Sequence, residues 1–121
     1  MKTNRTQPML KGTKMDKNNV KIYNKLVRDK IPQIIEADGK KCEIRIAGKE
    51  ELFQLLEAKL LEEAAEFNEA KNLEELADLM EVIFGLAKAL GYSEEEIMKI
   101  RESKKEVRGG FEKAIILLKV Y

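Results

Sequence analysis

Acidic residues spaced three apart occur in two consecutive stretches of the sequence. The first pair is Glu63 and Glu66, and the second pair is Glu75 and Asp78. Residues three apart on a helix are neighbours on one face, so each pair can direct two carboxylates toward one point. Hard divalent cations such as Mg²⁺ and Mn²⁺ prefer oxygen ligands. The spacing therefore indicates a candidate site for Mg²⁺ or Mn²⁺.

The phase of these pairs is more informative than their spacing. Glu63 lies seven residues after Leu56 and three after Leu60, and Glu75 lies four before Leu79, so both fall within the apolar stripes of their helices. A carboxylate that faces a core is costly unless it is compensated. Several such groups repel one another unless they are protonated, paired with Lys or Arg, or bound to cations. The competing interpretation is a solvated helix face, because a single acidic pair is a weak motif.

Composition limits the chemistry that is available. The chain of 121 residues has no histidine and a single cysteine, Cys42, which excludes histidine metal sites and makes a thiolate zinc site implausible. One cysteine allows no intrachain disulfide, so we expect a reducing, cytoplasmic setting. The 23 Lys and Arg residues balance 22 Asp and Glu residues. We therefore expect no nucleic-acid partner, and no apolar run is long enough to predict a membrane span.

Hydrophobic periodicity predicts the elements that must hold the carboxylates. Long helices are expected over 49–71 and 72–90, with Asn72 as a plausible N-cap, and a third helix is expected from Ser93 to about 107. A shorter helical pattern covers 26–37, with Pro32 in the first turn, and 42–47 alternates like a strand. Residues 111–121 fit either a strand pairing with 42–47, which we favour, or a continuing helix.

The fold expected from these elements is mostly all-α. Residues 1–19 are predicted to form a flexible tail, and 20–121 a single domain. Long helices joined by very short turns form antiparallel hairpins, and two hairpins make a four-helix bundle. One chain supplies barely enough long helices for this bundle. We therefore expect oligomerisation, as a homodimer or homotetramer, to complete it, beside a short two-stranded β ribbon.

Three segments resemble one known family. Glu63-x-x-Glu66 followed by Glu75-x-x-Asp78 resembles the signature of the all-α NTP pyrophosphatase superfamily, which contains MazG-like and phosphoribosyl-ATP pyrophosphohydrolase-like proteins. The segments 23–32 (YNKLVRDKIP) and 108–111 (RGGF) resemble the opening and end of a small MazG-like branch. The resemblance covers residues 21–121. One departure is that only eight residues separate Glu66 from Glu75, fewer than in many family members.

The resemblance implies a fold, an activity and a set of site residues. It implies a helical bundle, usually oligomeric, that cleaves nucleoside triphosphates between the α and β phosphates with Mg²⁺, giving a nucleoside monophosphate and pyrophosphate. By matching positions, the metal ligands would be Glu63, Glu66, Glu75 and Asp78. Glu62 is a candidate, beside Glu63, to orient or deprotonate the attacking water.

Two basic clusters are candidates for binding the phosphates of a nucleotide substrate. One comprises Lys25, Arg28 and Lys30, and the other comprises Arg101, Lys104 and Arg108, which share a helix face. The competing interpretation is that these side chains only solvate the surface or pair with the abundant glutamates.

Three functions follow as expectations. The leading one is a nucleotide pyrophosphohydrolase, with house-cleaning of non-standard nucleotides as one role. The second is phosphoribosyl-ATP hydrolysis in histidine biosynthesis, ranked lower because the opening and closing motifs resemble the MazG-like branch. The third, from a different class, is a non-catalytic helical dimerisation module.

Overall fold

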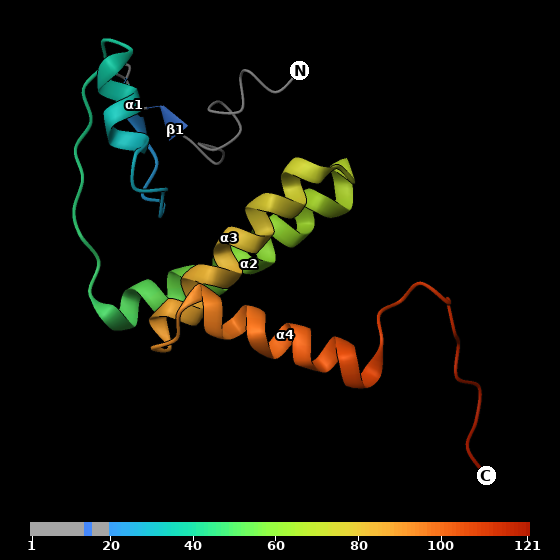
Figure 1. The fold of residues 1–121 in the computed structure, drawn as a ribbon. Coiled ribbons are helices and arrows are strands. Elements are labelled where there is room, and N and C mark those ends of the chain that lie inside the picture. The colour runs from blue at the N-terminus through green and yellow to red at the C-terminus, as the bar shows by residue number, and fades with distance from the viewer. Residues whose placement is uncertain (1–13, 16–19) are drawn as a thin grey trace. The chain divides into compact units, whose positions relative to one another are not determined.

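The computed structural model describes residues 14–15 and 20–121, which divide between two compact units, 1–47 and 48–121 (Figure 1). The chain is mostly helical, as predicted. Among the described helices, none has both the length and the apolar character needed to cross a bilayer.

The described residues of the first unit form two very short strands and one short helix. Strands β1 (Lys14–Met15) and β2 (Lys21–Ile22) pair antiparallel, with Lys14 opposite Ile22 and Met15 opposite Lys21. Helix α1 (Ile31–Ala37) follows, and its Ile31 side chain is buried. The remainder of the predicted tail over 1–19 lies outside the described residues, but its residues 14–15 form β1.

Helix α1 is shorter than the pattern over 26–37 predicted. Pro32 lies in its first turn, as expected, and Lys30 is the N-cap residue. A helix that began at Leu26 would have placed Pro32 in its interior, where proline removes a hydrogen bond and clashes with the preceding turn. The proline therefore fixes the start of α1.

The second unit is built on an antiparallel helical hairpin. Helix α2 (Lys49–Ala70) and helix α3 (Leu73–Ala89) lie side by side, joined by a two-residue turn (Figure 1). Lys71 adopts a left-handed conformation that ends α2 and donates its backbone N–H to the Phe67 carbonyl at 2.7 Å. The Asn72 side chain accepts from the Glu75 N–H at 2.9 Å, which confirms the predicted N-cap.

Small and branched side chains fill the contact between these two helices. Leu56 of α2 and Val82 of α3 are buried. Gly85 lies against Leu56, and a Cβ added at Gly85 would stand only 3.2 Å from the Leu56 Cδ2 atom. The absent side chain at Gly85 therefore lets the helices approach closely at this level.

Helix α4 (Glu94–Arg108) begins after the end of α3. Ser93 and Glu96 form a complete capping box, in which the Ser93 Oγ accepts from the Glu96 N–H at 3.1 Å and the Glu96 carboxylate accepts from the Ser93 N–H at 2.8 Å. Gly91, with a φ of 97°, lies in the turn before it. Helix α4 contacts α3 but not α2, and it diverges from the hairpin (Figure 1).

The predicted β ribbon between 42–47 and 111–121 is wrong. Neither segment forms a strand, and 111–121 is not a helix either. Ile44 and Ile46 are 60% and 85% exposed, so the alternating pattern packs on no neighbouring face. Alternation produces a stable strand only where a partner completes the hydrogen-bond ladder and covers the apolar side.

Candidate metal centre

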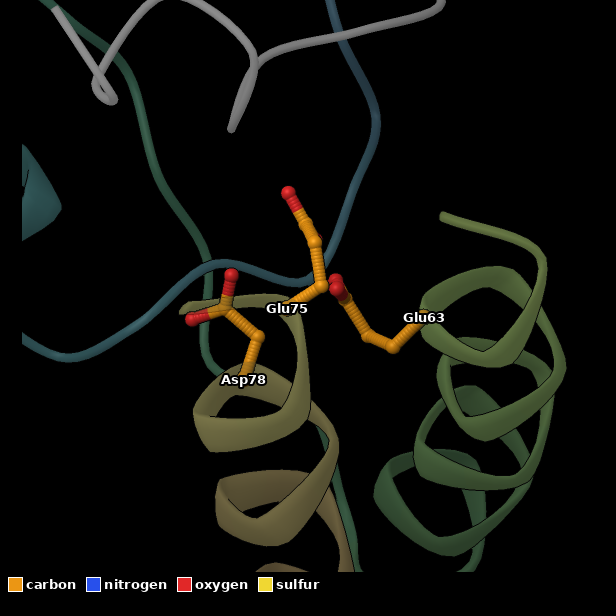
Figure 2. A group of neighbouring side chains, drawn as sticks. All are labelled: Glu63, Glu75 and Asp78. Atoms are coloured by element: carbon orange, nitrogen blue, oxygen red, sulfur yellow. The ribbon is translucent and has the colours of Figure 1, made fainter. Parts of the chain in front are cut away.

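Three carboxylates from two helices converge near the turn of the α2–α3 hairpin. Glu63 extends from α2 toward α3, where Glu75 and Asp78 stand on adjacent turns (Figure 2). Each of the three residues offers one carboxylate oxygen, and these oxygens all lie within 4.8 Å of one another. The helical phase predicted this convergence, and the structure shows it for these three residues.

The local sequence explains how the three side chains reach one place. The two-residue turn keeps the end of α2 and the start of α3 together, and the Asn72 cap fixes the first turn of α3, to which Glu75 belongs. Glu75 is only 6% exposed, whereas Glu63 and Asp78 are half-buried. The cluster is thus sheltered on its α3 side.

The oxygen spacing fits a small divalent cation. Mg²⁺ takes six oxygen ligands at about 2.0–2.1 Å, so ligands on opposite sides of the ion are about 4.2 Å apart. Oxygens that already lie within 4.8 Å need only small side-chain rotations to reach that geometry. Three carboxylates would leave further positions for water or phosphate oxygens, which is the usual arrangement for Mg²⁺.

The pKa of Glu63 is raised above its ordinary value. Burial is the main cause, because it disfavours the charged carboxylate, and the negative charges of Glu62, Glu75 and Glu66 act in the same direction. The positive charge of Lys59 opposes the shift. A bound cation would act in the same direction as Lys59, but with a larger charge.

Lys59 is a part of the site that was not predicted from the sequence. Its Nζ atom lies 3.6 Å from Glu62 Oε1 and 3.8 Å from Glu63 Oε2, and its side chain is only 18% exposed. The signal that could have identified Lys59 is its spacing of three and four residues from Glu62 and Glu63. The basic clusters predicted from the sequence lie elsewhere in the chain and do not include it.

The other two predicted acidic residues lie at the margin of the cluster. Glu66 is half-buried and close enough to raise the pKa of Glu63, but it is not one of the three residues whose oxygens converge. Glu62 is also half-buried and pairs with Lys59. The assignments of Glu66 as a ligand and of Glu62 as a catalytic residue stay predictions.

The predicted phosphate-binding cations belong to two different parts of the fold. The cluster of Lys25, Arg28 and Lys30 belongs to the first unit, whereas the carboxylates belong to the second. Arg101, Lys104 and Arg108 are exposed on α4, which starts beyond the opposite end of α3 from the carboxylates. Arg101 pairs there with Glu102 at 3.3 Å.

The chain matched no protein-family model, no curated protein and no solved structure.

Proposed function

We propose that this chain is a Mg²⁺-dependent nucleotide pyrophosphohydrolase that cleaves between the α and β phosphates of a nucleoside triphosphate. The observation that carries the proposal is the convergence of Glu63, Glu75 and Asp78 between two antiparallel helices. Such a group of carboxylates is costly to maintain at a half-buried position without a cationic ligand. The resemblance of three sequence segments to the MazG-like proteins supplies the choice of substrate class.

In the proposed mechanism, Glu63, Glu75 and Asp78 would hold the cation, with Glu66 as a further ligand at the margin. A divalent ion held there would supply positive charge that neutralises phosphate oxygens and favours deprotonation of the attacking water. Glu62 accepts the proton of the attacking water, and Lys59 holds the Glu62 carboxylate in place. Phosphoryl transfer depends mainly on positioning and charge stabilisation, so this small set of residues is chemically sufficient.

The experiment that tests the proposal is a substrate panel with release of pyrophosphate as the readout. The panel contains standard and non-standard nucleoside triphosphates and phosphoribosyl-ATP, each with Mg²⁺. We expect wild-type protein to release pyrophosphate from at least one nucleoside triphosphate. Glu63→Gln and Asp78→Asn should each lower the rate by more than about 100-fold, since losing residues that merely support metal ligands already costs 10–100-fold.

A matched control is available on the solvent side of the same hairpin. Glu81→Gln removes an exposed carboxylate from α3, with the same change in charge, and should leave the rate unchanged. Full activity in Glu63→Gln would refute the ligand assignment. Exclusive hydrolysis of phosphoribosyl-ATP would favour the biosynthetic activity instead.

Mg²⁺ titration distinguishes the enzyme from a non-catalytic dimerisation module. An ion that binds only the folded chain raises the unfolding temperature in proportion to the logarithm of its concentration above Kd. We expect this rise for wild type and its loss in Asp78→Asn. An unfolding temperature that does not change with Mg²⁺ concentration, together with no hydrolysis, would favour the non-catalytic dimerisation module.

A further inference from the structure

Lys59 is a shielded cation that contacts two carboxylates without a short hydrogen bond to either. Its Nζ atom lies 3.6 Å from Glu62 Oε1 and 3.8 Å from Glu63 Oε2, and its side chain is only 18% exposed. A charge-assisted N–H···O hydrogen bond is shorter, at about 2.7–2.9 Å. An ammonium group carries three N–H donors. Lys59 therefore has donors available for a further anion that approaches the carboxylates.

The position of this ammonium group is set within helix α2. Lys59 lies four residues before Glu63 on the same helix, so the two side chains are neighbours on one face. The predicted basic clusters belong instead to the first unit and to α4. Lys59 is thus a cation whose distance from the converging carboxylates is determined by the hairpin itself.

The charges at the proposed metal centre favour a role for this cation. Glu63, Glu75 and Asp78 together carry more negative charge than one divalent ion neutralises. A phosphate chain is itself an anion, so the carboxylates repel it unless further positive charge lies beside them. Lysine is a common phosphate ligand because its ammonium group is a compact point charge.

We propose, on the basis of the proposed function, that Lys59 binds a phosphate oxygen of the substrate when a cation occupies the site. Neighbouring ligands of an octahedral Mg²⁺ ion are about 3 Å apart, since each lies about 2.1 Å from the ion. A phosphate oxygen that binds the ion next to Glu63 would therefore lie within reach of the same ammonium group. Lys59 would keep its contact with Glu62 and donate a different N–H to the phosphate.

The proposal concerns the phosphate chain and not the base or the sugar. The cation competes with Lys59 for Glu63, and the phosphate then replaces Glu63 as a partner of Lys59. Removing the ammonium group should therefore change the binding of two ligands differently. Mg²⁺ alone should bind as tightly as before or more tightly, whereas a phosphate chain should bind more weakly. A lysine that only supported the fold would weaken the binding of both.

The test is calorimetric titration of the full chain with methylenediphosphonate, a base-free pyrophosphate mimic whose P–C–P bridge is not hydrolysed. Each protein is first saturated with Mg²⁺. We expect Lys59→Met to raise the dissociation constant for methylenediphosphonate about tenfold or more, because hydrogen bonds between charged groups are among the strongest that side chains make. Lys59→Arg keeps the positive charge and should bind more tightly than Lys59→Met. Lys49→Met, which removes an exposed lysine from the first turn of α2, should match wild type.

Two outcomes would overturn the proposal. One is equal affinity of Lys59→Met and wild type for methylenediphosphonate, and the other is a loss of Mg²⁺ affinity as large as the loss of diphosphonate affinity. Neither result would contradict the proposed function, which is tested separately by release of pyrophosphate. A wild-type chain that binds neither Mg²⁺ nor methylenediphosphonate would contradict both. Should Lys59→Met lose helical circular dichroism, Lys59→Gln takes its place in the same titrations.

Discussion

Lys59 places a positive charge beside the carboxylates of Glu62 and Glu63, where a divalent ion would also place one. Its ammonium group lies within 4 Å of carboxylate oxygens of Glu62 and Glu63, and its side chain is largely shielded from solvent. A lysine so placed offsets part of the repulsion in the metal-free chain. It also opposes the arrival of a second cation.

Replacing Lys59 should therefore strengthen cation binding. We expect Lys59→Met to increase the apparent affinity for Mg²⁺ by roughly twofold to fivefold, because partly exposed ion pairs contribute about 0.2–1 kcal/mol. Isothermal titration calorimetry measures the change. Lys88→Met, an exposed substitution on α3, is the control and should have no effect. An unchanged or weaker affinity in Lys59→Met would show that the lysine does not compete with the ion.

The raised pKa of Glu63 makes stability depend on pH. Between the ordinary carboxyl pKa of the unfolded chain and the raised pKa of the folded chain, the folded state binds more protons. Without divalent ions, this contribution to stability is fully present below the ordinary pKa. It is lost as the pH rises through that window.

Glu63→Gln should remove this pH-dependent loss of stability, because glutamine has nearly the same shape as glutamate and does not ionise. Unfolding temperatures measured in a chelator from about pH 4 to pH 7 should fall less steeply in Glu63→Gln than in wild type. Glu69→Gln, at an exposed position on the same helix, should follow the wild-type curve. Parallel curves for all three proteins would contradict the assignment of the raised pKa.

At this scale the sequence predicted the convergence of Glu63, Glu75 and Asp78, because helical phase alone decides which side of each helix a residue takes. The sequence did not predict that Glu66 would be left out of the group of converging carboxylates. That distinction depends on side-chain rotamers and on the exact turn between α2 and α3, which periodicity does not describe.

Among the elements, α4 depends most on its N-terminal cap. No side chain of α4 is buried, so packing contributes less to its stability than in α2 or α3. We expect Ser93→Ala to destabilise the helix by about 1 kcal/mol, because it removes the hydrogen bond to the Glu96 N–H. Circular dichroism during urea unfolding measures the loss.

Ser103→Ala supplies the control for this substitution. Ser103 lies within α4 and is exposed, and alanine is the better helix former, so the change should be neutral or slightly stabilising. Equal effects of the two substitutions would show that the cap contributes nothing particular.

Helices α2 and α3 were predictable because each has a sustained apolar period, and α4 was predictable from its capping signal, Ser93 with Glu96 three residues later. The absence of a strand at 42–47 was not predictable, because alternating apolar and polar residues indicate only which side of a strand would be apolar. Whether a partner strand is available is a matter of tertiary structure. The same reason applies to 111–121, where Ile115 to Leu118 are 76–85% exposed.

At the scale of the whole molecule, periodicity gave no indication that the chain divides between residues 47 and 48. The segment between α1 and α2 lacks a run of proline, glycine or serine, which would mark a linker. The boundary between the two units lies where contacts between residues are sparse. A single sequence does not show where these contacts are sparse.

The missing side chain at Gly85 would affect which cation the proposed metal site prefers. Gly85 stands seven residues after Asp78, in the same column of α3, and its closeness to Leu56 limits the distance between the two helix axes. That distance in turn limits how far apart carboxylates on opposite helices can be. Gly85→Val would push the helices apart and should shift preference from Mg²⁺ toward the larger Ca²⁺, whose oxygen ligands lie about 0.2–0.6 Å farther out. At the proposed metal site, the single hydrogen atom of Gly85 would thus help to set the preferred ionic radius.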